Sequence, residues 1–104
     1  MEKDEIRKII FNAIDLLNQA RDEEDKIPIN PDTHLFGKNG YLDSMGLVSL
    51  LIDIEESLQN EGLDVSLSDE RAMSERNSPF RDVPALTEYI GKLISKNAEG
   101  YERE

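Results

Sequence analysis

The 104-residue chain contains no cysteine and a single histidine, His34. Without cysteine it can form no disulfide, thiolate nucleophile or cysteine-ligated metal site. One histidine also excludes a metal site built from several imidazoles. No apolar run approaches the ~20 residues of a membrane-spanning helix, and the acidic residues 1–5 lack the apolar region of a signal peptide. The sequence therefore predicts a cytoplasmic protein with no bound metal and no stable membrane insertion.

Positive charge is scarce as well. The chain has 12 Lys and Arg residues and 23 Asp and Glu residues, which gives a formal net charge of −11. Nucleic acids and anionic lipids need a cationic protein surface, so we expect neither as a partner. Opposite electrostatic fields accelerate encounter, which favours partner proteins with basic docking surfaces. The chain length implies a single domain with one modest core, and we expect a monomer.

Apolar residues recur at three- and four-residue spacing in three stretches, which predicts three amphipathic helices. They cover about residues 6–20, 43–60 and 82–96. A shorter helix is expected over residues 68–73, after a short extended segment. No stretch has a convincing pattern for a sheet. The expected fold class is therefore all-α: a small four-helix bundle of three main helices and one short helix.

The single helical domain is expected to span residues 1–96, and residues 97–104 to form a flexible C-terminal tail. A long first loop joins the first two helices, over about residues 22–43, and contains two prolines and two glycines. Its apolar residues would be unnecessary in a disordered linker, so we predict an ordered loop that buries them. These residues are Ile27, Ile29, Leu35, Phe36 and Leu42.

The second predicted helix has an unusually wide apolar arc and a single polar stripe. The stripe consists of Gly46, Ser49, Asp53, Glu56 and Asn60. An arc this wide indicates a central helix that touches several neighbours, or one wall of an apolar cavity.

Either Asp43 or Ser44 fits the N-cap of this helix. Ser44 also fits a second interpretation, as an attachment point. A serine at a helix N-terminus offers a surface hydroxyl beside free backbone N–H groups, where the helix dipole favours a phosphodiester. The residues alone leave both interpretations open.

Other chemistry finds little support. Acidic pairs are inevitable among 23 acids and indicate solvated faces, residues 25–37 lack the ligand spacing of a calcium-binding loop, and residues 37–40 lack that of a nucleotide-binding loop. His34 is expected to satisfy a local hydrogen bond in the loop. It is also the only candidate base for a hydrolase that would use Ser44, and it lies in the loop ten residues upstream.

The region around Ser44 resembles the acyl carrier protein family, in which Asp-Ser-Leu or Asp-Ser-Met opens the second helix and the serine carries a phosphopantetheine arm. The likeness covers about residues 5–95. Its motifs are Leu35-Phe36-Gly37, Gly40-Tyr41-Leu42-Asp43-Ser44-Met45, Val48, Leu51-Ile52, Ile54-Glu55, and the stretch from Phe80 to Ile90 that leads into the last helix.

The resemblance implies a carrier that is not itself an enzyme. It would hold acyl or aminoacyl groups as thioesters on a covalent 4′-phosphopantetheine arm at Ser44, flanked by Asp43 and Met45. A phosphopantetheinyl transferase would attach the arm, and an acyl- or aminoacyl-loading ligase, acyltransferases or synthases would be further partners. The pathway would be a specialised lipid, polyketide or aminoacyl pathway, with fatty acid biosynthesis as the family's most common setting.

The resemblance also implies two groups of binding residues. Those that would contact partner enzymes are Met45, Val48, Asp53, Glu55 and Glu56. Those that would line a cargo cleft are Leu50, Leu51, Ile54, Leu63 and Met73.

Two features depart from family members that serve fatty-acid synthesis. Gly46 and Ser49 stand where those members carry acids, and the span from Glu55 to Val83 is longer than usual. Residues 42–48 and 77–79 are closer to the D-alanyl carrier branch. The alternative interpretation is an acidic helical protein-interaction module without a prosthetic group, which would use the second helix as its docking face.

Overall fold

The computed structural model describes residues 2–37, 40–67 and 79–102, the last seven of them by their backbone alone. The described part contains helix α1 (Lys3–Gln19), the 3-10 turn η1 (Glu23–Asp25), helix α2 (Ser44–Asn60) and helix α4 (Val83–Glu102). Within these ranges there is no strand, only two isolated bridges between single residues. The all-α prediction is thereby confirmed. The short helix predicted at residues 68–73 lies outside the described residues.

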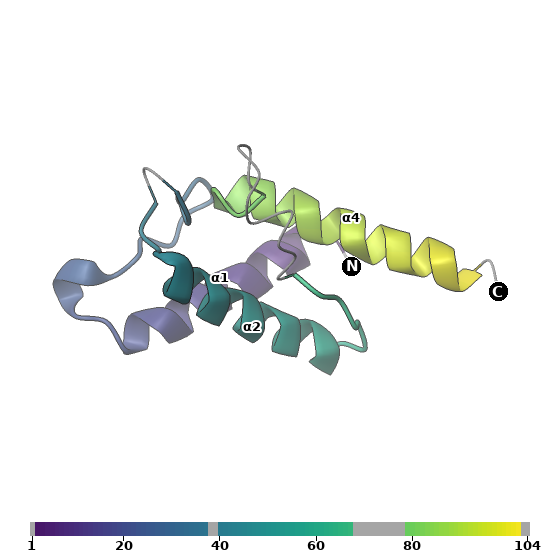
Figure 1. Ribbon diagram of the computed structural model, residues 1–104, viewed down its shortest axis with the longest axis horizontal. Coiled ribbons are helices and arrows are strands. Elements are labelled where there is room, and N and C mark those ends of the chain that lie inside the picture. The colour runs from purple at the N-terminus through teal and green to yellow at the C-terminus, as the bar shows by residue number, and fades with distance from the viewer. Residues whose placement is uncertain (1, 38–39, 68–78, 103–104) are drawn as a thin grey trace.

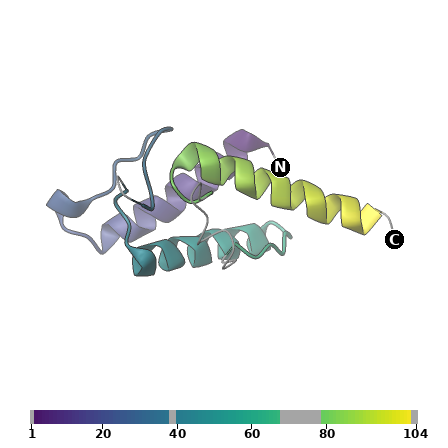
Figure 2. The same ribbon diagram turned by 45° about the horizontal axis from the view of Figure 1, so that its top comes forward.

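Helix α1 packs against both α2 and α4. In Figure 2 α2 runs along the lower edge of the molecule and α4 lies above it. In Figures 1 and 2 the C-terminal part of α4 extends beyond the other two helices, which accounts for the elongated shape of 50 × 28 × 21 Å. Sequence periodicity placed the end of this helix near residue 96, whereas α4 continues to Glu102.

The predicted apolar face of α1 is confirmed in part: Ile6, Ile10, Ala13 and Ile14 are buried, whereas Leu16, which was expected on the same face, is 55% exposed. The same face also buries one polar residue, Asn18. Its side-chain amide donates to Ile27 O at 2.9 Å, and its side-chain oxygen accepts from Ile27 N–H at 2.7 Å. This pair of bonds returns the chain to the core immediately after η1.

The loop between α1 and α2 is mostly packed as predicted. Ile27, Leu35 and Leu42 are buried and Phe36 is half-buried. The prediction is wrong for Ile29, whose side chain is 44% exposed. Ile29 precedes a turn over residues 30–33, and there the buried residue is Thr33, whose hydroxyl donates to Pro28 O at 2.6 Å.

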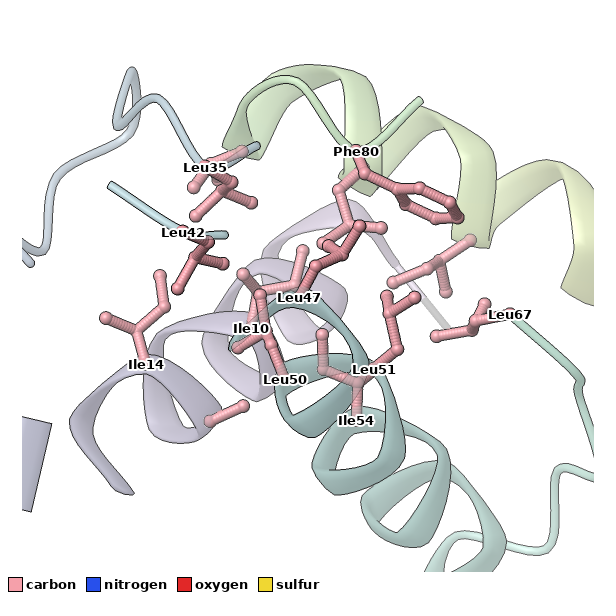
Figure 3. Close-up of a cluster of buried hydrophobic side chains, with 14 of the residues drawn as sticks. Ile10, Ile14, Leu35, Leu42, Leu47, Leu50, Leu51, Ile54, Leu67 and Phe80 are labelled. Carbon is pink, nitrogen blue, oxygen red and sulfur yellow. The ribbon is translucent and has the colours of Figure 1, made fainter. Parts of the chain in front are cut away.

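Figure 3 shows the core, in which side chains from all three helices and from the connecting segments meet. Burial of a leucine or isoleucine side chain contributes ~1.5–3 kcal/mol, so this cluster is the main source of stability. Phe80, just before α4, is fully buried and meets Tyr89 edge to face, with ring centroids 5.6 Å apart. The core therefore holds the start of α2 and the start of α4 in one packed unit.

Candidate functional site

The first turn of α2 is capped by Asp43, not by Ser44. The Asp43 side-chain oxygen Oδ1 accepts a hydrogen bond from Gly46 N–H at 2.8 Å, and the Asp43 backbone is extended, as an N-cap requires. Its carbonyl oxygen accepts the first helical bond, from Leu47 N–H at 2.9 Å. Of the two residues that fit the cap by sequence, the structure assigns the role to Asp43.

This cap explains why a glycine follows it at position 46. A Cβ atom added to Gly46 would lie 3.1 Å from Leu42 Cδ2 and 3.2 Å from Asp43 Oδ1. Both distances are tight, so a side chain there would press on the capping carboxylate. The absence of an acid at position 46 therefore has a local structural cause.

Ser44 is the first residue of α2 and is exposed. Among the residues that the structure describes, its hydroxyl takes part in no side-chain hydrogen bond. The first turn of the helix itself contains no acid, so among its own residues none offsets the partial positive charge of the N-terminus, and the Asp43 carboxylate of the cap offsets part of it through Gly46 N–H. The Ser44 hydroxyl is thus exposed and makes no hydrogen bond to another described residue. It lies close to backbone N–H groups, which favour an anionic phosphodiester.

The start of α2 is fixed in place by backbone hydrogen bonds to the segment before α4. Leu35 N–H donates to Arg81 O at 2.8 Å, Phe36 N–H donates to Phe80 O at 3.1 Å, and Val83 N–H donates to Thr33 O at 3.0 Å. Leu42 N–H in turn donates to Leu35 O at 2.8 Å. Residues 33–37 and 40–43 are therefore anchored by these bonds, and the exposed Ser44 follows directly after them.

Exposed apolar side chains gather next to Ser44 in the sequence. Met45 is 81% exposed, Ile52 50% and Val48 38%. Their spacing of three and four residues puts them on one face of α2, opposite its buried face. Tyr41, also half exposed, lies just before the helix. Met45 and Val48 were predicted to contact partners; Ile52 was missed, although the same spacing would have found it.

The three acids predicted to contact partners have different environments. Glu56 is exposed and Asp53 is partly exposed. Glu55 is partly buried, and its Oε1 accepts a hydrogen bond from Leu67 N–H at 2.8 Å. This contact could not be predicted from sequence, because it joins residues twelve positions apart across a turn. Glu55 thus serves an internal contact that the prediction did not include.

The residues predicted to line a cargo cleft lie on the inner side of α2. Leu50, Leu51 and Ile54 are fully buried in the core, and Leu63 is half-buried against it. Met73 lies outside the described residues. The four described residues belong to one apolar cluster. Those on α2, however, are covered by neighbouring side chains (Figure 3).

The remaining sequence candidates lie elsewhere. His34 is exposed, and its backbone forms an isolated bridge with Asp82. In the described ranges no group of three or more His, Asp and Glu side chains is placed to hold a metal ion. No helix in the same ranges combines the length and apolar character needed to cross a bilayer.

Comparison with known proteins gives no further information on identity: no protein family, no curated protein and no solved structure matches the chain.

Proposed function

We propose that this protein is a carrier that bears acyl or aminoacyl groups as thioesters on a 4′-phosphopantetheine arm attached to Ser44. The observation that carries the proposal is the environment of the Ser44 hydroxyl. It is exposed at the first position of α2, and the capping role that would otherwise explain a serine there belongs to Asp43. The resemblance of residues 5–95 to acyl carrier proteins supplies the identity of the group.

The only group that the chain itself must supply for this modification is the Ser44 hydroxyl. The Ser44 oxygen would attack the β-phosphorus of coenzyme A, forming the phosphodiester and breaking the pyrophosphate bond. Adenosine 3′,5′-bisphosphate would leave, and a base on a magnesium-dependent transferase would take the hydroxyl proton. The arm brings its own thiol, which suits a chain without cysteine.

Partner enzymes would dock on the exposed face of α2. Met45, Val48 and Ile52 offer apolar contacts next to the arm, and Asp53 and Glu56 offer charge for basic partner surfaces. We propose as partners the transferase, a loading ligase, and acyltransferases or synthases. We further propose a monomeric cytoplasmic protein of a specialised pathway, folded as a four-helix bundle with a long first loop and a short helix at residues 68–73.

The test is the intact mass after incubation with coenzyme A, magnesium and a broad-specificity phosphopantetheinyl transferase. We expect a gain of one phosphopantetheinyl group, which Ser44→Ala abolishes. Ser49→Ala is the matched control, because Ser49 is an exposed serine of the same helix, and it should be modified like the unaltered protein. Absence of a gain with several transferases, or modification that persists in Ser44→Ala, would contradict the proposal.

The alternative is an acidic interaction module without a prosthetic group. The exposed apolar row of Met45, Val48 and Ile52 favours it, because such a row can bind a partner helix without any arm. A folded protein that stays unmodified in the mass experiment would support this alternative.

A further inference from the structure

Met45 places a thioether sulfur at the surface, directly after Ser44. Its side chain is 81% exposed, more than any other of the exposed large apolar side chains in the described ranges. The chain contains no cysteine, so methionine is its only residue type whose sulfur can be oxidised. Of the three methionines, Met1 and Met73 lie outside the described residues. Oxidation of sulfur requires access to it, so the exposure of Met45 favours reaction there.

Met45 begins the exposed apolar row of α2. Val48 and Ile52 continue the row at spacings of three and four residues, with exposed fractions of 38% and 50%. Oxidation converts the apolar thioether of a methionine into a sulfoxide, which is polar and accepts hydrogen bonds. At Met45 this change would fall at the end of the row that adjoins Ser44, and it would leave Val48 and Ile52 unaltered.

Oxidation at this position is compatible with the fold, because Met45 is not part of the core. The side chains of α2 that fill the core are Leu47, Leu50, Leu51, Ile54 and Leu58. The cap of the helix joins Asp43 Oδ1 to Gly46 N–H, and the Met45 side chain takes no part in it. Water can solvate a sulfoxide at this exposed position in the free protein. A cost arises only when a partner covers the sulfoxide with an apolar surface.

We propose that Met45 is a redox-sensitive site, whose oxidation to the sulfoxide makes the Ser44 end of the exposed row polar and thereby slows attachment of the arm. The oxidant is hydrogen peroxide. One peroxide oxygen binds the sulfur as the O–O bond breaks, two electrons pass from sulfur to peroxide, and the other oxygen leaves with both hydrogens as water. A dithiol reverses the step: it becomes a disulfide, and the sulfoxide oxygen leaves as water. The effect on the arm rests on the proposed function, because a transferase that reaches the Ser44 hydroxyl would cover Met45.

The first part of the test uses the free protein, with no transferase present. After treatment with dilute hydrogen peroxide, peptide mass spectrometry locates the gain of one oxygen at each methionine. We expect Met45 to be oxidised without a change in helix content or denaturation midpoint, and we expect weaker retention on a hydrophobic interaction column. Met45→Leu is the matched control, because it keeps an apolar side chain that peroxide does not oxidise. Peroxide should change its retention much less.

The second part measures kcat/KM for arm attachment by a phosphopantetheinyl transferase, before and after peroxide treatment of the carrier alone. For the unaltered protein we expect a fall of about tenfold, within the range expected for covering an unpaired polar group. Methionine sulfoxide reductases with a dithiol should restore the rate. Treated and untreated Met45→Leu should react alike, because only Met1 and Met73 remain to be oxidised in it. Met45→Gln, which places a polar amide at the same position, should be slow with or without peroxide.

The inference is overturned if Met45 stays unoxidised in the folded protein, or if its oxidation unfolds α2. It is equally overturned if oxidised and unaltered protein accept the arm at the same rate. An equal loss of rate in Met45→Leu would also overturn it, by assigning the effect to Met1 or Met73. If protein that has not been treated with peroxide accepts no arm, the carrier proposal fails and the effect on attachment fails with it. The first part of the test still decides, in that case, whether Met45 is an oxidation site of the folded protein.

Discussion

The two segments that flank α2 are held by different kinds of contact. Before the helix, Thr33, Leu35 and Phe36 are bound to residues 80–83 by backbone hydrogen bonds. Residues 63–67, after the helix, contain two buried apolar side chains, a backbone bond from Leu63 N–H to Leu58 O at 2.8 Å, and a bond from Leu67 N–H to the carboxylate of Glu55. Among the described residues, the first segment is bound to a distant segment through backbone groups, whereas Leu67 N–H is bound by a side chain of α2.

The two ends of α2 are therefore connected to segments that are held by different kinds of contact. The backbone bonds of Thr33, Leu35 and Phe36 tie the chain before α2 to residues 80–83, which under the proposed function would support Ser44 as an attachment point. Under the proposed function, the attachment point would lie at the end of α2 that follows the backbone hydrogen bonds.

The largest expected effect comes from a glycine in each connection to α2, Gly40 before the helix and Gly62 just after it. A Cβ on Gly40 would lie 2.2 Å from Leu35 O, a backbone atom that cannot move aside, so we expect Gly40→Ala to cost ~3 kcal/mol or more. Gly62 has open space around it and only its positive φ opposes a side chain, so Gly62→Ala should cost about 1 kcal/mol. Chemical denaturation measures both. A cost for Gly62→Ala equal to that for Gly40→Ala would remove the contrast between the segments.

A smaller effect is expected at the junction between residues 33–43 and α2. Asp43→Ala removes the cap bond to Gly46 N–H and should lower the free energy of unfolding by about 1 kcal/mol. Asp43→Asn keeps a capping oxygen and should recover most of it. Ser44→Ala should change stability by less than ~0.5 kcal/mol, as at an ordinary surface position. If denaturation showed Ser44→Ala to be as costly as Asp43→Ala, the hydroxyl would belong to the cap and the case for attachment would weaken.

The helices of this protein were predictable from sequence because their signals are local. Apolar spacing located α1, the Asp43-Ser44 pair indicated the start of α2, and its predicted end near Asn60, before Gly62, is where the structure has it. The choice between Asp43 and Ser44 as cap was not predictable, since both residues have the required oxygen. It depends on backbone geometry at a single position.

Contacts between segments were the part that sequence could not supply. The hydrogen bonds of Asn18 to Ile27 and of Glu55 to Leu67 join residues separated by a turn or a loop, and nothing in the spacing of either pair announces them. The prediction for Ile29 was wrong for a related reason. Its apolar character indicated burial, but Ile29 is exposed and the polar Thr33 nearby is buried. Polar side chains that bind backbone groups decided these three positions.

The smallest expected effect concerns an ion pair that joins α1 to α4 without backbone groups. Lys3 donates a hydrogen bond to Glu88, and this bond together with the lysine charge lowers the pKa of Glu88 below its ordinary value of 4.5. Because the folded-state pKa is the lower one, the contribution to stability is present above pH 4.5 and is lost as pH falls through the folded-state pKa.

Lys3→Met should raise the pKa of Glu88 in an NMR titration, whereas Lys8→Met, the same charge change elsewhere on α1, should leave it nearly unchanged. Both groups are exposed, so the change in stability should be small and should shrink further with salt. The unaltered protein could instead lose a large part of its free energy of unfolding in acid, and Lys3→Met could remove that loss. This result would show that side-chain pairs, and not the backbone hydrogen bonds of Thr33, Leu35 and Phe36, hold α4 in place.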